Sequence, residues 1–348
     1  MSRVNPGYSG KPFAGSSLNP HAVSFGPMPT ISVVIPVHGV EDYLVACLDS
    51  VLGQQGPDIE VIAVDDASAD GSGAILAARD DRRLQVVRTE SAVGPGRARE
   101  LGAKQATGEY VWFVDGDDEL ATGALAAVAA ELDRLHPDVL ILDYENLYPD
   151  GTTTPSGADL SGPELTTLPD SPRLIHLTMT VWSKVFRREF LDGLGVSFGP
   201  GIHEDVPVSA AALLAAGRIA VLNRVCYRYR RARRGSLMAA TTDRHFDILD
   251  SYQQILTERT LVPPVRAAIF ERAIWHYTTV LPLVPRSRRR EFFGQMTRDF
   301  RRWRPAEFGF PPGARGAKLR LVGRGRYRTY SALEPLNRVR VWVARRAR

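Results

Sequence analysis

The chain has 348 residues, of which 44% are apolar, enough to bury one large hydrophobic core or two modest ones. Its two cysteines, Cys47 and Cys226, lie far apart without metal-ligand spacing, which excludes a disulfide framework or zinc site and favours a reducing, cytoplasmic setting. No apolar run reaches the ~18 residues of a membrane helix, and the first residues lack the order of a signal peptide, so we expect no membrane span.

Charge is divided unevenly along the chain. From Arg286 onward there are 19 Lys and Arg residues against 4 Asp and Glu residues, and before it 25 against 35. Such a tail could face nucleic acid, a phosphate-rich polymer or an anionic membrane surface, or be a solvated helical surface. We expect four segments: a disordered Gly/Pro/Ser-rich leader at 1–29, an α/β domain at 30–240, a helical extension at 241–305 and a basic, loosely ordered tail at 306–348.

From residue 31, buried strands alternate with amphipathic helices. Strands are predicted at 31–36, 60–66, 84–88, 110–114 and 138–142, and helices at 41–54, 71–79, 95–107, 122–135, 245–261, 263–284 and 287–303. Continuous apolar strands between helices indicate a mostly parallel α/β sheet with helices on both faces, followed here by a helical basic C-terminal region. Ligands of such sheets bind beyond the carboxyl ends of the strands.

Two of these strand ends carry clustered acids: Asp65 with Asp66, and Asp115 with Asp117 and Asp118. Carboxylates this close repel one another unless a divalent cation neutralises them, and hard oxygen ligands suit Mg²⁺ or Mn²⁺. Mg²⁺ is usually held by one or two carboxylates together with substrate phosphates, which indicates a nucleotide substrate. The alternative is that Asp117 and Asp118 cap the helix that follows.

Other nucleotide and nucleophile motifs are absent from the sequence. "GPGRAR" at 94–99 has no third glycine and follows the third strand, so it does not fit a dinucleotide-binding fingerprint. Neither GxxxxGK[ST] nor GxSxG occurs, which excludes a P-loop NTPase and a serine nucleophile elbow.

Five stretches together resemble the family 2 glycosyltransferases with the GT-A fold. They are "ISVVIPVHGVEDYLVACLDSVLGQ", "EVIAVDDASADGS", "GPGRARELGAKQATGEYVWFVDGDDEL", "VWSKVFRREFL" and "HEDVPV", in family order over residues 30–236. Within the family the chain looks most like the transferases of wall teichoic acid and related polyol-phosphate polymers, including those fused to CDP-glycerol glycerophosphotransferase domains.

The resemblance implies a nucleotide-sugar site. Asp65 and Asp66 would accept hydrogen bonds from the base and ribose, and Arg99 would lie near the nucleotide or its phosphates. The D-x-D aspartates would hold Mn²⁺ or Mg²⁺, Asp117 being the better candidate for direct ligation. The full set implied is Pro36, Val37, His38, Asp65, Asp66, Arg99, Asp115, Gly116 and Asp117.

The resemblance also implies a catalytic base. Asp205 matches the carboxylate that removes the acceptor hydroxyl's proton, with Glu204 as its neighbour. The alternative is that both simply favour the N-terminus of a helix through its dipole.

Further residues are candidates for contact with the acceptor or the diphosphate. Trp182 could stack on a sugar or lie in the core, and His203 could contact phosphate or be structural. The arginines resemble a mobile basic loop over the diphosphate, but could be a surface cluster. The set is Trp182, Lys184, His203, Arg230, Arg233 and Arg234.

The implied function is a metal-dependent inverting glycosyltransferase, a hexosyl- or N-acetylhexosaminyltransferase. It would move a sugar from a UDP-sugar to a hydroxyl of a cell-envelope glycan or polyol-phosphate polymer. The alternatives are an inactive GT-A-fold protein that binds an anionic polymer, and a CDP-glycerol-type transferase. We expect no nucleic-acid partner and a cytoplasmic location, with "RVRVWVARRAR" at 338–348 as a candidate for peripheral contact with the inner face of the plasma membrane.

Overall fold

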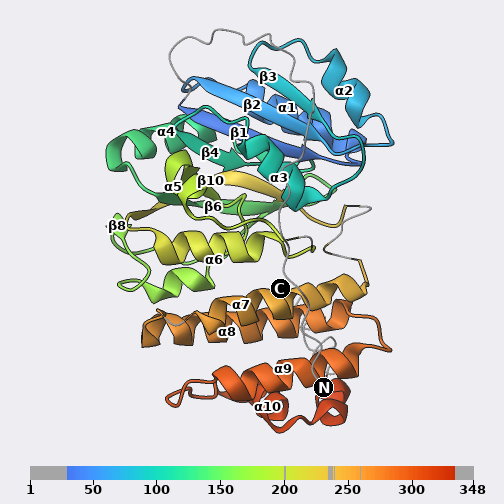
Figure 1. Cartoon of the computed structure of the whole chain (residues 1–348), viewed down its shortest axis with the longest axis vertical. Coiled ribbons are helices and arrows are strands. Elements are labelled where there is room, and N and C mark those ends of the chain that lie inside the picture. Colours follow the sequence, from blue (N-terminus) through green and yellow to red (C-terminus); the bar gives the residue numbers. More distant parts are fainter. Residues whose placement is uncertain (1–29, 200, 234–237, 239, 259, 334–348) are drawn as a thin grey trace.

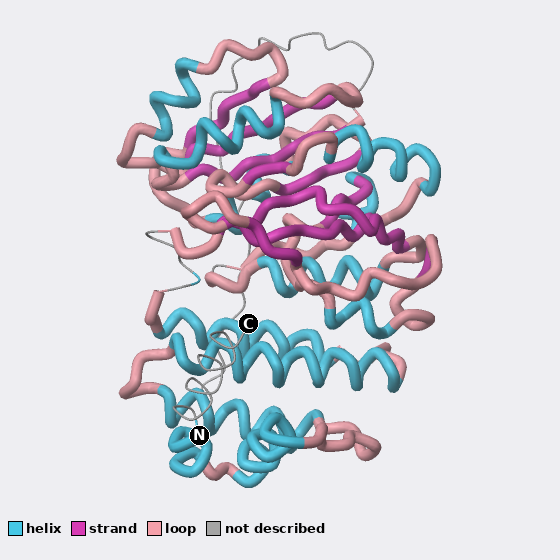
Figure 2. The backbone as a smooth tube through the Cα atoms, turned by 180° about the vertical axis from the view of Figure 1, so that it is seen from behind, coloured by secondary structure: helices cyan, strands magenta, loops and turns pink. Residues whose placement is uncertain are grey.

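The computed structural model describes residues 30–199, 201–233, 238, 240–258 and 260–333. A sheet and its covering helices form one half of the described chain, and the other half is helical (Figures 1 and 2). Successive layers of helix lie below the sheet in Figure 1: α6, then α7 with α8, then α9 with α10.

The sheet has the strand order β3-β2-β1-β4-β9-β6-β10-β5, with β7 paired to β6 and β8 to β10. The pairs β1–β2, β1–β4, β2–β3 and β6–β10 are parallel, and β9 runs antiparallel between β4 and β6. The strands are β1 Ile31–Val37, β2 Ile59–Asp65, β3 Leu84–Arg88, β4 Tyr110–Phe113, β5 Glu119–Leu120, β6 Val139–Leu147, β7 Thr153–Pro155, β8 Leu165–Thr166, β9 Lys184–Arg187 and β10 Ile219–Arg230.

Helices cover both faces of the sheet. The buried residues of α1, α2 and α4 pack on one face, and those of α3 and α6 on the other. The helices are α1 Glu41–Leu52, α2 Ser72–Ala78, α3 Pro95–Ala103, α4 Ala124–Leu135, α5 Arg188–Gly193, α6 Asp205–Ala215, α7 Asp247–Thr257, α8 Pro263–Val280, α9 Arg289–Trp303 and α10 Gly313–Arg324, with 3₁₀ turns η1 Pro172–His176, η3 Asp243–Phe246 and η4 Leu281–Leu283.

Strand β1 shows why the central strands read as continuous apolar runs. Ile31, Val33 and Ile35 belong to the core under α1, while Val34 belongs to the core on the opposite face. Both faces are buried, so alternation in polarity is absent, as expected for parallel strands covered on two sides. The predicted α/β fold, mostly parallel with helices on both faces and a helical C-terminal region, is confirmed.

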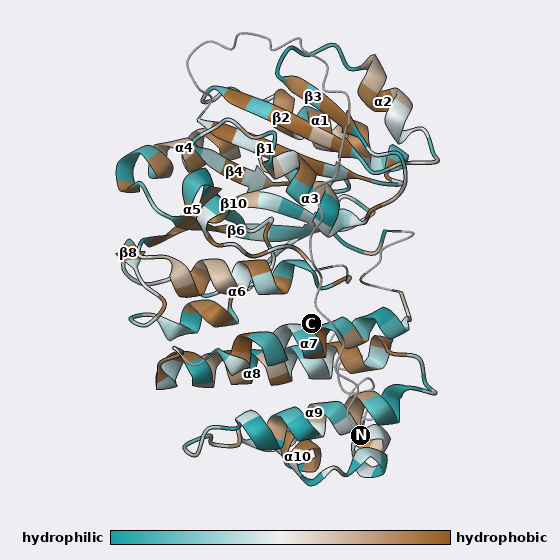
Figure 3. Cartoon of the chain, viewed as in Figure 1, coloured by the Kyte–Doolittle hydropathy of each residue, from teal (hydrophilic) through white to brown (hydrophobic). Residues whose placement is uncertain are grey.

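The helical half shares a core with the sheet. One cluster of buried side chains runs from Val34 and Phe113 in the sheet through Tyr277 of α8 to Phe300 of α9 and Val322 of α10. The two halves differ in the polarity of their residues: in Figure 3 the strands are largely hydrophobic, while α9 presents many hydrophilic residues.

The predicted loosely ordered tail at 306–348 is wrong for its first part. Residues 313–324 form α10, and Leu319, Val322 and Tyr330 are buried. The sequence did not predict this helix because it has few apolar residues among many basic ones. Those apolar side chains are buried only by packing against α9. The expected leader at 1–29 and the basic stretch at 338–348 lie outside the described residues. In the part of the chain that is described, no helix is long and apolar enough to cross a membrane.

Candidate active site

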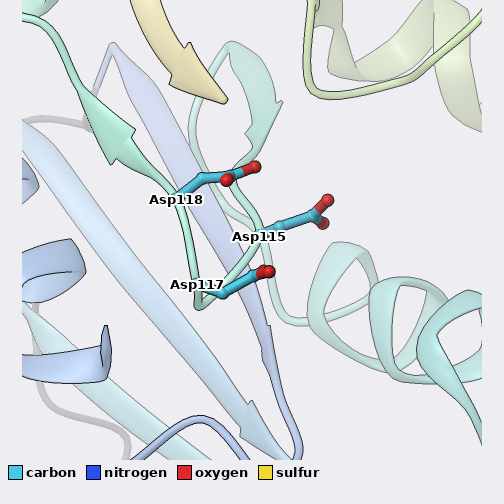
Figure 4. Close-up of side chains that lie close together, drawn as sticks. All are labelled: Asp115, Asp117 and Asp118. Atoms are coloured by element: carbon cyan, nitrogen blue, oxygen red, sulfur yellow. The ribbon is translucent and has the colours of Figure 1, made fainter. Parts of the chain in front are cut away.

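The loop after β4 gathers three carboxylates. One oxygen each from Asp115, Asp117 and Asp118 lies within 4.8 Å of the others, and Figure 4 shows the three side chains extending the same way from one loop. They do not cap the following helix: α4 begins at Ala124 after a left-handed Gly123 and has no side-chain cap. The capping alternative is therefore wrong, and the cluster needs another explanation.

Asp118 faces the protein. Its carboxylate accepts hydrogen bonds from the Tyr227 hydroxyl (2.7 Å) and from the backbone N–H of Arg230 (2.7 Å), and it is 1% exposed. Burial, followed by the carboxylates of Asp117 and Asp115, raises the pKa of Asp118 well above its ordinary value. The Tyr227 hydroxyl also accepts the N–H of Asp115 (3.1 Å), so β10 fixes the shape of the acidic loop.

Asp115 and Asp117 are the outward-facing members, with 22% and 17% of their side chains exposed. Asp117 pairs with the Arg233 guanidinium, which follows β10. Burial, partly offset by the charge of Arg233, raises the pKa of Asp117. The carboxylates of Asp115 and Asp117 are oxygen donors suited to Mg²⁺ or Mn²⁺. The guanidinium of Arg233 supplies positive charge at the same place.

Arg99 of α3 links this cluster to a second acidic group. One of its terminal nitrogens lies 2.6 Å from Asp115, and the other pairs with Glu204. Arg99 and Glu204 are each 6% exposed, so this pair is shielded from water, whereas the Asp115 side chain keeps 22% of its surface exposed. Arg99 was expected near the nucleotide or its phosphates. In the structure both terminal nitrogens are instead engaged by carboxylates that lie 89 residues apart in sequence.

Close packing holds this arrangement together. A Cβ atom on Gly96, at the start of α3, would lie 2.9 Å from Glu204 Cγ and 2.8 Å from Phe198 Cβ. Only a residue without a side chain lets α3 approach Phe198 and Glu204 this closely. Gly96 of "GPGRAR" therefore allows the close packing of α3 that brings Arg99 to Glu204.

Asp205, the expected base, opens α6 beside Glu204. Burial, followed by the charge of Glu204, raises the pKa of Asp205 to about 7, with Arg99 and Lys184 acting in the opposite direction. A carboxylate with a pKa near neutrality can accept a proton at physiological pH. Asp205 also occupies the first turn of the helix, so the helix-dipole alternative and the base hypothesis are compatible.

The acids after β2 hold neighbouring loops. Asp66 accepts the backbone N–H groups of Val93 (2.7 Å) and Gly94 (2.8 Å), and so fixes the start of α3. Asp65 accepts the N–H of Ser68 (3.0 Å) and lies 3.5 Å from Arg88 Nε. Their predicted contacts with base and ribose stay predictions, since their oxygens here bind protein groups.

The loop after β1 lies against both acidic loops. His38 is exposed, and its Nδ1 donates to the Asp66 carbonyl (2.7 Å). A Cβ on Gly116 would lie 3.0 Å from the Pro36 carbonyl oxygen. Pro36, Val37, His38 and Gly116 thus come together at the carboxyl ends of β1, β2 and β4, where a ligand was expected.

Three of the acceptor candidates are buried. Trp182 stacks on Tyr227 (ring centroids 4.5 Å apart) and on Tyr229 (5.3 Å). His203 lies 3.2 Å from a nitrogen of His245, and burial, then His245, lowers the pKa of His203 to about 3. The core interpretation of both residues is favoured.

Lys184 is also inside the protein. Its ammonium donates to the carbonyls of Thr178 (2.7 Å) and Thr180 (2.8 Å) and to the Ser183 hydroxyl (3.3 Å). Burial lowers the pKa of Lys184 to about 7, and the charge of Asp205 opposes this. The side chain is fully buried, and its charge opposes the rise in the pKa of Asp205.

The basic residues at the end of β10 and directly after it divide into three cases. Arg230 pairs with Glu119 and donates to the Asp117 carbonyl (2.8 Å), which attaches β10 to the acidic loop. Arg233 reaches Asp117. Arg234 lies outside the described residues.

Sequence reasoning missed Tyr227 and the structural role of Asp118. The signal available was the alternation of "CYRYR" at 226–230, which places two tyrosines on one face of a strand. It could not show that the strand passes beside residues 115–119.

Together, the mixed sheet and the acidic loops at the carboxyl ends of its parallel strands define a protein with the GT-A fold of nucleotide-sugar transferases. A comparison with family models identifies the family: residues 32–195 match the model described as "Glycosyl transferase family 2". The chain carries a domain of this family.

Two relatives illustrate the similarity. The glycosyltransferase EpsJ of Bacillus subtilis is 30% identical over 212 residues, covering 58% of this chain and 61% of EpsJ. The poly(ribitol-phosphate) beta-N-acetylglucosaminyltransferase TarS of Staphylococcus aureus is 32% identical over 219 residues, covering 61% of this chain and 37% of TarS. The chain thus aligns with less than two thirds of either relative.

Solved structures agree on the fold. Residues 1–349 of S. aureus TarS, in complex with UDP-GlcNAc, match with a TM-score of 0.67 at 23% identity, covering 89% of this chain and 91% of that chain. A mannosyltransferase from Pyrobaculum calidifontis, in complex with GDP-Man and Mn²⁺, matches with a TM-score of 0.52 at 18% identity, covering 88% and 84%.

Proposed function

We propose that the protein is a metal-dependent inverting glycosyltransferase that moves a sugar from a nucleotide-diphosphate sugar, a UDP-sugar first, to a hydroxyl of a cell-envelope glycan or polyol-phosphate polymer. The observation that carries the proposal is the Arg99 bridge. It brings the acidic cluster of Asp115 into one site with the helix that begins at Glu204 and Asp205.

Each half of this site has a distinct chemical task. Asp115 and Asp117 would hold Mn²⁺ or Mg²⁺, which supplies stabilisation of the negative charge on the departing diphosphate. Asp205 accepts the proton of the attacking hydroxyl, since its raised pKa makes it basic near pH 7. Arg99 pairs with both Asp115 and Glu204, the neighbour of Asp205, and so links the two halves of the site.

The substrate classes come from the relatives. TarS has been crystallised with UDP-GlcNAc and is described as acting on poly(ribitol-phosphate), which supports a UDP-sugar donor and a polyol-phosphate acceptor. The Mn²⁺ complex of the mannosyltransferase supports a divalent cation in this fold.

The decisive experiment combines donor binding with turnover. We expect a UDP-sugar with Mn²⁺ to raise the melting temperature, and Asp117→Ala to reduce turnover at least ~100-fold. Asp192→Asn, which removes an exposed carboxylate on α5, is the matched control and should behave as wild type. Near-normal turnover of Asp117→Ala with EDTA present would reject the metal role. Polymer binding without any donor binding would favour the inactive binding protein.

A further inference from the structure

A pocket of about 440 Å³ lies between α9 and α10, outside the active site. Its walls carry four arginines and two aromatic rings: Arg301, Arg304, Arg320, Arg324, Phe300 and Phe310. Volumes of ~300–1,000 Å³ are usual for small-molecule sites, so a phosphate with its attached sugar alcohol would fit.

The pocket is built by packing within the C-terminal helices. Phe310 stacks on the buried ring of Phe300, with centroids 6.1 Å apart and planes at 22°. The guanidinium groups of Arg304 and Arg320 lie 6.0 Å and 5.1 Å from the centroid of Phe310. The aromatic ring therefore orients both cations along one wall.

The backbone fixes another arginine. Arg301 Nε donates to the Gly323 carbonyl (2.8 Å), which leaves its terminal nitrogens for other acceptors. A Cβ on Gly323 would lie 3.0 Å from the Phe300 ring, so the glycine permits the close approach of α10 to α9.

The charge of this pocket is not balanced within the described chain. Between residues 286 and 333 there are 14 Lys and Arg residues and 3 Asp and Glu residues. Across the described parts of the protein, no carboxylate forms an ion pair with any of the four pocket arginines. Clustered cations repel, and a bound anion would offset this repulsion.

We propose that this pocket binds phosphate groups of the polyol-phosphate acceptor, as a second contact remote from the reacting hydroxyl. The identity of the polymer rests on the proposed function. Arginine suits phosphate because its planar fork donates two parallel hydrogen bonds. The pocket is lined by residues of α9 and α10 and of the segment between them. These two helices lie on the far side of α7 and α8 from the sheet (Figure 1), so only a chain of many units would engage both sites.

A membrane surface fits the pocket less well. Lipid binding by a surface helix needs large apolar side chains beside the cations. None of the exposed large hydrophobic residues of the described chain lies between 286 and 333. The arginines instead surround a concave space, which fits single phosphate groups of a flexible chain.

A binding titration tests the site without any turnover. The probe is poly(ribitol phosphate) of graded length, with polygalacturonate as a polyanion without phosphate. We expect the double variant Arg304→Ala/Arg320→Ala to bind long chains about tenfold more weakly. The control Arg326→Ala/Arg328→Ala removes the same charge from two arginines of the same region that do not line the pocket, and it should change binding less than about twofold. Equal binding of polygalacturonate, equal loss in the control, or arginine-dependent binding to anionic phospholipid vesicles instead of the polymer would each overturn the proposal.

Kinetics give a second readout. A remote contact raises the effective concentration of a long acceptor at the active site. The Arg304→Ala/Arg320→Ala variant should therefore show a KM about tenfold higher for long acceptors, with unchanged KM for short acceptors and for the donor. An unchanged KM for long acceptors contradicts the proposal. If no donor is turned over but binding still depends on these arginines, the proposed activity fails while the phosphate site stands.

Discussion

Replacement of Asp205 by Asn separates catalysis from stability. The amide keeps the shape of the side chain but cannot accept the hydroxyl's proton. Loss of a positioned base lowers turnover by about 10²–10⁴-fold. In the wild type, turnover should rise with pH through about 7, because only the ionised carboxylate is a base and its pKa is about 7. The residual activity of the variant should lack this rise.

The same substitution should stabilise the protein at alkaline pH. Folding raises the pKa of Asp205 from 3.8 to about 7, so the native state favours the protonated acid. The stabilising contribution is present below pH 3.8 and is lost progressively as pH rises to about 7. The shift sets an upper limit of about 4 kcal/mol on this loss, and partial contact with water reduces it to about 1–3 kcal/mol. The amide removes the loss because it stays neutral at every pH.

Two measurements check this reasoning: the pH profile of kcat/KM, and the Tm of thermal unfolding at about pH 5 and about pH 8. Relative to wild type, Asp205→Asn should gain a few degrees of Tm at the higher pH and less at the lower. Asp192→Asn, on the exposed surface of α5, should change neither quantity. A variant that keeps the wild-type rise through pH 7, or gains no stability at the higher pH, would refute the role of Asp205.

Two further variants test the surroundings of the site. Lys184→Met removes a buried amine whose positive charge lowers the pKa of Asp205. Because the pKa of Lys184 is itself about 7, this charge is only partly present near neutrality, so the midpoint of the pH–rate profile should move modestly to higher pH. An unmoved midpoint would show that Lys184 does not act on the base. Tyr227→Phe removes the hydroxyl that donates to Asp118 and accepts from the acidic loop, and should lower the free energy of unfolding by about 2–3 kcal/mol in urea titrations. A loss below about 0.5 kcal/mol would mean that these buried bonds are replaced by water.

The parallel half of the sheet was predictable because its strands are buried on both faces. β1, β2 and β4 read as largely apolar runs, and the carboxyl ends of β2 and β4 carry the acids. β9 and β10 were not predicted, for two different reasons. β9 has only four residues, and β10 carries Asn and Arg side chains because only four of its twelve residues are buried.

The site was predictable by residue type and only partly by contact. The acids after β4 could be singled out because clustered carboxylates at a strand end suit a divalent cation, and Asp205 was singled out by the family resemblance; their roles stay predictions. The bridge from Arg99 to Glu204 spans 105 residues and depends on how α3 packs, which no local pattern reports. Trp182 and His203 were ambiguous in sequence, since an aromatic side chain suits a binding face and a core equally well, and packing favours the core.

The ion pair between Arg233 and Asp117 has a consequence for how ligands enter the site. If Asp117 holds the proposed cation, that cation would compete with the guanidinium for the same carboxylate, and the displaced Arg233 would be available to the negatively charged donor. We infer that cation and donor bind with positive cooperativity, each increasing the affinity of the other by the same factor. Mn²⁺ alone would then bind weakly, and the metal would be retained chiefly while a nucleotide is bound.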